Sequence, residues 1–108
     1  MNYELQNRKA EAERLMAKLP ELEIVFYSNG EWVDGKAKPK AWVNNDGYLM
    51  LSAEDGSGFI DYYNEASYEL GLPDADDPYI NPQLEKFAED NGYYWEWDSP
   101  AAVVLMEV

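Results

Sequence analysis

The sequence contains no cysteine and no histidine, and these two absences exclude several kinds of site at once. Without cysteine the chain can form neither a disulfide framework nor a thiolate metal site. Without histidine it lacks the side chain that serves most often as a general base and as a metal ligand. A nucleophilic triad needs such a base beside serine or cysteine. We therefore expect no catalytic centre of that kind and no enzymatic activity.

Long apolar runs are also missing, and those present are far too short for a membrane span. A secretory leader needs a basic start and an apolar run of about 7–15 residues. This chain instead begins Met1-Asn2-Tyr3-Glu4 and continues with mixed charges. Its 108 residues are 46% hydrophobic and 15% aromatic, which is enough for a core and unlike a disordered segment. We expect one cytoplasmic domain over residues 1–108.

Basic residues are almost absent from the second part of the chain. There are 8 basic and 22 acidic residues, which give a net charge of −14. Residues 1–40 hold seven acids and seven bases, so the net charge falls on residues 41–108, where Lys86 is the only base among fifteen acids. Such a one-sided charge can serve solubility alone, or it can speed association with a basic partner. It disfavours direct binding to nucleic acid, whose phosphates require clusters of lysine and arginine.

Apolar spacing and turn residues predict eight elements in the order α-β-β-β-α-α-β-β, with no second domain. One helix is expected over residues 3–19, ended by Pro20, and another between Asn81-Pro82 and Asn91-Gly92. A helix between them is expected from an apolar stripe of Phe59, Tyr63, Ala66 and Leu70.

The expected strands form hairpins rather than βαβ units. In residues 31–40, Trp32-Val33 can continue a hairpin before Asp34-Gly35 turns the chain. Hairpins without βαβ alternation favour an α+β fold, in which an antiparallel sheet of about five strands carries the helices on one face. Its strands are expected over residues 22–28, 41–44, 48–52, 93–98 and 102–107, and Phe59, Tyr63, Leu70, Leu84 and Phe87 are expected to pack against it.

The aromatic segment 93–98 is the strongest reason to consider a carbohydrate site. Alternation places Glu96 and Asp98 on one face and three aromatic rings, including Trp95 and Trp97, on the other. Glycoside hydrolysis needs two carboxylates in one cleft, and here acids and rings separate. We interpret the segment as a strand with an aromatic core face and a solvated acidic face. A carbohydrate-binding or carbohydrate-active domain using Trp95, Trp97 or Trp32 remains an alternative, which exposed tryptophans would favour.

The loop Asp74-Ala75-Asp76-Asp77 begins like a calcium-binding loop. The EF-hand also requires a ligand at the fifth position and glycine at the sixth, and these positions hold Pro78 and Tyr79. We therefore interpret the segment as an acidic loop between helices, and we expect no metal site and no cofactor.

Carboxylates recur along the expected second helix. Asp61, Glu65 and Glu69 stand at i, i+4 and i+8, about 6 Å apart along a helix at 1.5 Å per residue. Like charges at this spacing each cost a few tenths of a kcal/mol, and no base intervenes. An ordinary solvated helix face is one interpretation, and a partner-binding surface that includes tyrosines and the neighbouring loops is the other. The candidate partner-binding residues are Glu54, Asp55, Asp61, Tyr62, Glu65, Tyr68, Glu69, Asp74, Asp76 and Asp77.

In size, charge and composition the chain resembles the small acidic inhibitors encoded by phages and mobile elements. These include DNA mimics that block restriction enzymes, CRISPR effectors or uracil-DNA glycosylase. The resemblance implies a non-enzymatic inhibitor that occupies the basic nucleic-acid-binding surface of a host protein, such as a nuclease. An immunity protein or antitoxin that neutralises a basic toxin requires the same physics and is the second alternative.

Overall fold

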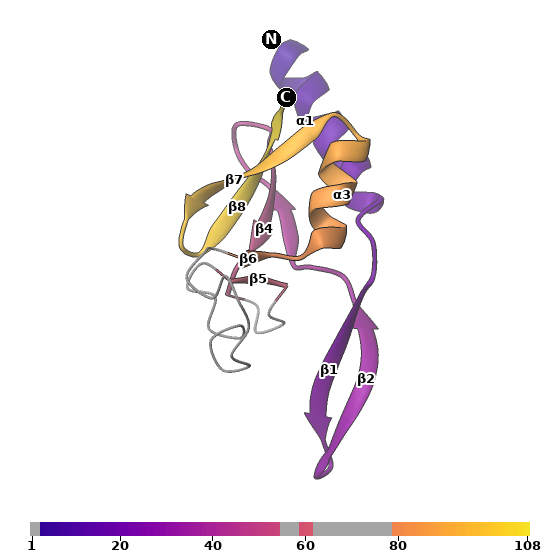
Figure 1. The fold of residues 1–108 in the computed structure, drawn as a ribbon. Helices are drawn as coiled ribbons and strands as arrows, with labels where there is room; N and C mark the ends of the chain where they lie inside the picture. The colour runs from indigo at the N-terminus through magenta and orange to yellow at the C-terminus, as the bar shows by residue number, and fades with distance from the viewer. Residues whose placement is uncertain (1–2, 55–58, 62–78) are drawn as a thin grey trace.

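The computed structural model describes residues 3–54, 59–61 and 79–108, which form a mixed α+β fold with antiparallel sheets (Figure 1). Its centre is a four-stranded antiparallel sheet in the order β3-β4-β8-β7. The strands are β3 (Ala41–Val43), β4 (Leu49–Ser52), β7 (Tyr93–Ser99) and β8 (Ala102–Glu107). Within the described ranges there are two helices, α1 (Tyr3–Ala17) and α3 (Pro82–Asp90). The sequence prediction of an α+β fold with antiparallel pairing is confirmed at this level.

Both helices cover the same face of this sheet. Leu51 and Val103 are opposite each other on the two central strands, and both are fully buried. They share one core with Leu15 of α1 and Leu84 of α3. The alternate residues of the same strands, Met50 among them, belong to a separate small cluster. Because successive residues of a strand point to opposite faces, the helices occupy only one side of the sheet.

The start of α3 follows from its sequence. The side-chain oxygen of Asn81 accepts a hydrogen bond from the backbone N–H of Gln83 at 2.8 Å, and Pro82 occupies the first turn. This side chain satisfies one of the N–H groups that a helix start leaves unpaired, and proline has no N–H to lose. The predicted helix start is confirmed.

Strand β7 has the alternation that its sequence predicts. Trp95 and Trp97 are half-buried and pack against the main core, whereas Glu96 and Asp98 are exposed. The pairing with β8 shifts between Trp97 and Ser99, which leaves Asp98 as the extra residue of a bulge. The interpretation of this segment as a strand with an aromatic core face and an acidic outer face is confirmed.

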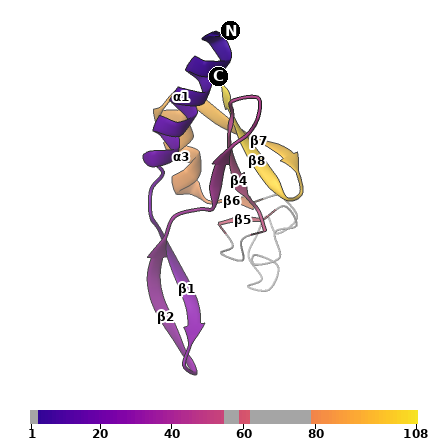
Figure 2. The ribbon, with the colours of Figure 1, turned by 180° about the vertical axis from the view of Figure 1, so that it is seen from behind.

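The first hairpin departs from the prediction. β1 (Leu22–Ser28) pairs only with β2 (Glu31–Ala37) in a sheet of its own, and Figures 1 and 2 show it extending away from the body. The expectation that residues 22–28 belong to the main sheet is therefore wrong. Asp34-Gly35 does not turn the chain either, because Gly35 lies within β2 opposite Ile24. The base of the hairpin enters the core through Leu22 and the half-buried Ala37.

The segment around Phe59 also differs from the prediction. Phe59 was expected to begin a helix, but the next two residues form the short strand β5 (Ile60–Asp61), which pairs with β6 (Tyr79–Ile80). The carbonyl oxygen of Phe59 accepts the backbone N–H of Asn81 at 2.8 Å. Phe59 is nevertheless buried in the core, as predicted. Leu84 and Phe87 also pack there, while Tyr63 and Leu70 lie outside the described residues.

Candidate functional site

The described ranges include only two of the ten candidate partner-binding residues. Glu54 is exposed just after β4, where its backbone N–H donates to Ser52 Oγ at 3.0 Å. Asp61 is the last residue of strand β5. The prediction that it begins a helical row of three carboxylates is therefore wrong. The remaining candidates lie outside the described residues: Asp55, Tyr62, Glu65, Tyr68, Glu69, Asp74, Asp76 and Asp77.

Four acidic residues lie on α3 and on the neighbouring strand β7, and we call this group the acidic edge. It consists of Glu85 and Glu89 of α3 with Glu96 and Asp98 of β7. All four side chains are exposed. Strand β7 is the last strand of the sheet and packs beside α3. A shallow groove of about 190 Å³ runs between them, lined by Glu85, Glu89 and the 45% exposed Tyr94.

Bases do not neutralise this edge. Lys86 is the only base after residue 40, and its Nζ lies 3.0 Å from Asp90 Oδ2, one helical turn further along α3. Among the residues that the structure describes, the four carboxylates of the acidic edge form no ion pair. Their negative charge is therefore available to a partner.

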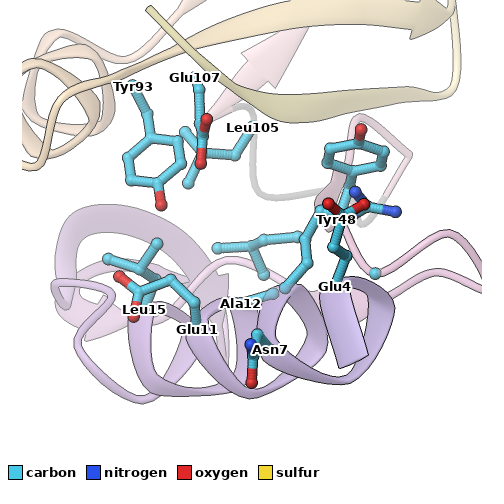
Figure 3. Close-up of a pocket in the computed structure, with 12 residues that line it drawn as sticks. Glu4, Asn7, Glu11, Ala12, Leu15, Tyr48, Tyr93, Leu105 and Glu107 are labelled. Carbon is cyan, nitrogen blue, oxygen red and sulfur yellow. The ribbon is translucent and has the colours of Figure 1, made fainter. Parts of the chain in front are cut away.

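A second feature is a cleft of about 470 Å³ between α1 and the sheet, here called the α1 cleft (Figure 3). Its floor is apolar and buried. The rim holds the turn before β4, with Gly47 and Tyr48, and polar side chains from three elements. The floor is lined by Ala12, Leu15, Leu49 and Leu105, and the polar rim by Glu4, Asn7, Arg8, Glu11, Tyr48, Tyr93 and Glu107.

Strand pairing and helical spacing bring these rim residues together. Tyr93 and Glu107 are directly opposite each other on β7 and β8. Figure 3 shows both extending from the sheet toward α1, while Glu4 and Glu11 project from the helix. Glu4 and Glu11 are seven residues apart, which is close to two helical turns and places them on one face.

Burial, the rim carboxylates and Arg14 together set the electrostatics of the α1 cleft. Burial raises the pKa of Tyr93, and the negative charges of Glu11 and Glu107 raise it further. Hydrogen bonds from Arg14 lower the pKa of Glu11, since they stabilise its charged form. Among the described residues, Glu107 forms no ion pair.

One arginine already lies at the end of this cleft. Arg8 donates from Nε to the carbonyl oxygen of Asp46 at 2.8 Å, and its guanidinium carbon lies 4.7 Å from the centre of the Tyr48 ring. Gly47, at φ +85°, lets the turn approach the helix, because an added Cβ would lie 3.2 Å from Leu5 Cδ1 and from Lys9 Cγ.

Sequence reasoning did not identify the α1 cleft. The charge balance of residues 1–40 gave no reason to select Glu4 or Glu11. The helical spacing of these two residues was the available signal on the α1 side. Tyr93 and Glu107 are fourteen residues apart, and only the register of β7 against β8 makes them neighbours.

Comparisons with protein-family models, curated protein sequences and solved structures gave no significant match. In the described ranges, no three acidic side chains are arranged to hold a metal ion. Neither described helix combines the length and the apolar character needed to span a bilayer.

Proposed function

We propose that the protein is a non-enzymatic inhibitor that binds the basic nucleic-acid-binding surface of a protein partner. The observation that supports this proposal is the acidic edge, where four exposed carboxylates on α3 and β7 have no basic partner among the described residues. Exposed carboxylates of this kind present to a protein the same feature as a nucleic-acid backbone, namely negative charge without a bound base.

The acidic edge presents two pairs of carboxylates, one on each side of the edge strand β7. Glu85 and Glu89 are one turn apart on α3, about 6 Å along the helix axis. Glu96 and Asp98 project from the outer face of a strand that is fixed by pairing with β8. Tyr94 on the same face adds an exposed aromatic ring, a residue type that often contributes strongly to protein interfaces.

The edge strand favours side-chain contacts over strand addition. An open edge can accept a further strand from a partner, and proteins oppose this with charges and bulges. β7 has both, since Glu96 and Asp98 alternate along it and Asp98 forms the bulge. The partner would therefore approach the carboxylates with arginine and lysine side chains. Long-range attraction would speed its association and weaken as salt rises.

Two alternatives differ in how the structure bears on them. An immunity protein or antitoxin would use the same acidic edge against a basic toxin, so only the identity of the partner separates it from the inhibitor. A carbohydrate-binding domain has less support, because Trp95 and Trp97 pack against the core. Trp42 on β3 is 38% exposed. Among the residues whose side chains the structure describes, it is the one tryptophan on the outer face of the sheet.

Competition with nucleic acid tests the proposal. The immobilised protein would capture partners from host lysate at low salt, and duplex DNA or RNA would then be added to the washed complex. We expect release of a basic nucleic-acid-binding protein, and purified partner should bind either nucleic acid or this protein. A ternary complex with both bound at once would falsify the proposal. A released toxin that has no nucleic-acid-binding surface would favour the immunity-protein alternative.

A further inference from the structure

We infer that the α1 cleft binds an alkyl guanidinium or ammonium group, supplied by an arginine or lysine side chain of the basic partner. In assigning the source to that partner, this inference rests on the proposed function. The cation site itself rests on the cleft alone. It lies at the junction of α1 and the end of the sheet, built from residues other than those of the acidic edge.

The size and lining of the cleft suit a long basic side chain. Its volume of about 470 Å³ lies within the usual range for ligand sites, roughly 300–1,000 Å³. A lysine or arginine side chain has an apolar stem and a charged end. The buried floor, with Leu15 and Leu105, offers apolar contact to the stem, and the rim carboxylates of Glu4 and Glu107 are placed for the charged end.

The charge of the rim favours a cation. Three carboxylates, those of Glu4, Glu11 and Glu107, line the cleft against one guanidinium, that of Arg8. Glu11 is engaged by Arg14 through two hydrogen bonds. Within the described ranges, Glu4 and Glu107 form no such pair, so their charge is open to an incoming cation.

Tyr93 and Arg8 support the same conclusion. Tyr93 lines the cleft, and its hydroxyl oxygen can accept a hydrogen bond from a cationic N–H. Arg8 is an example of a guanidinium already held at this cleft. It lies between the carbonyl oxygen of Asp46 and the face of the Tyr48 ring.

The direct test is a titration of isotope-labelled protein followed by NMR. The ligand is the capped peptide Ac-Gly-Arg-Gly-NH₂, and its control contains citrulline, which has the same shape without the charge. We expect shifts at residues of the α1 cleft with a Kd of about 1 mM, and about tenfold weaker binding of the citrulline peptide. Equal binding of the two peptides, or shifts confined to other surfaces, would overturn the inference.

Variants locate the site. Glu107→Gln and Glu4→Gln should each weaken binding of the arginine peptide by about fivefold, as expected for a partly exposed ion pair. Glu31→Gln is the matched control, since it removes the same charge from an exposed position at the tip of the β1-β2 hairpin, outside both the α1 cleft and the acidic edge. Equal weakening by the control variant would mean general attraction by net charge and would contradict a defined site.

Two further experiments are needed. One distinguishes a free amine from a partner side chain as the source of the cation, and the other distinguishes failure of this inference from failure of the proposed function. Spermidine supplies the same chemistry as a free amine, and binding of spermidine without binding of the peptide would overturn the assignment to a partner side chain. If a captured partner binds the Glu4→Gln/Glu107→Gln variant as tightly as the natural protein, the cleft inference fails and the proposed function stands. If the peptide binds the cleft but nucleic acid does not displace any captured partner, the cation site stands and the proposed function fails.

Discussion

Trp95 Nε1 donates a hydrogen bond to the carbonyl oxygen of Leu84 at 2.8 Å, and this bond joins the edge strand β7 to the first turns of α3. The indole ring packs against the main core, while its polar atom reaches the helix backbone. The same contact fixes α3 beside β7 and thereby sets the positions of the carboxylates of the acidic edge. A structural role for this tryptophan follows from its burial and its bond.

Replacing Trp95 with phenylalanine should destabilise the protein by about 1–3 kcal/mol, since it removes one hydrogen bond and part of a half-buried ring. Urea denaturation followed by circular dichroism measures this loss of unfolding free energy. Trp42→Phe is the matched control, because Trp42 is 38% exposed on the edge strand β3. An equal loss in both variants would contradict the role assigned to the bond with Leu84.

Replacing Gly47 with alanine should destabilise the protein more than replacing Gly92 with alanine. Both have positive φ, +85° and +83°, so alanine incurs a similar backbone cost of about 1 kcal/mol at either position. At Gly47 the new Cβ would also lie 3.2 Å from two side-chain carbons of α1, whereas at Gly92 no described atom lies within 4 Å. We expect Gly47→Ala to lower the unfolding free energy more than Gly92→Ala by about 1 kcal/mol or more. Equal effects in urea denaturation would show that the turn does not press against α1.

Tyr93 should ionise at a higher pH than a free tyrosine, whose pKa is about 10. A group with a raised pKa in the folded state contributes stability that is complete below its unfolded pKa and is lost as pH rises through the folded value. The loss of stability above about pH 10 should therefore be smaller in Tyr93→Phe than in the natural protein. NMR titration of labelled tyrosine measures the pKa directly, and Glu107→Gln should lower it. An unchanged pKa in Glu107→Gln would contradict the placement of that carboxylate beside the ring.

The sequence correctly predicted those elements that depend on residues close together in the chain. The start of α3 depends on Asn81 and Pro82, and the alternation of β7 depends on spacing within one strand, so both were predicted correctly. The prediction that the strand at residues 22–28 belongs to the main sheet was wrong for the opposite reason. Its residues favour a strand, but packing decides which sheet a strand joins. Asp34-Gly35 has the composition of a turn, yet Gly35 lies within β2.

The short strand β5 shows a second limit of sequence patterns. Phe59 fits an apolar stripe of helical spacing, yet the chain at residues 60–61 is extended by pairing with β6. A strand of two residues has no period that a sequence can display. The candidate site shows the same limit, since the α1 cleft depends on the register between Tyr93 and Glu107. The sequence showed only that the residues of the acidic edge are negatively charged. Their common location at one edge of the molecule depends on how α3 packs against β7.

The last prediction concerns the acidic edge. Reversing three of its charges with Glu85→Lys, Glu89→Lys and Glu96→Lys should weaken binding of the captured basic partner by at least about tenfold. Each replacement removes an attraction and adds a repulsion. The variant should still fold, because all three side chains are exposed and none is in an ion pair among the described residues. Circular dichroism checks the fold, and surface plasmon resonance measures association and dissociation at about 50 mM and about 500 mM salt.

A matched variant separates local contact from net charge. Glu13→Lys, Glu21→Lys and Glu31→Lys change the total charge equally, at exposed positions outside the acidic edge. If the partner recognises the acidic edge, this control should keep most of the affinity, and only the edge variant should lose the salt dependence of association. If both variants weaken binding equally, the partner responds to the overall charge of the molecule, and the acidic edge is not its binding surface. Binding by the natural protein that is equally tight at both salt concentrations would contradict an electrostatic interface altogether, because exposed charges more than about 8 Å apart are screened at physiological salt.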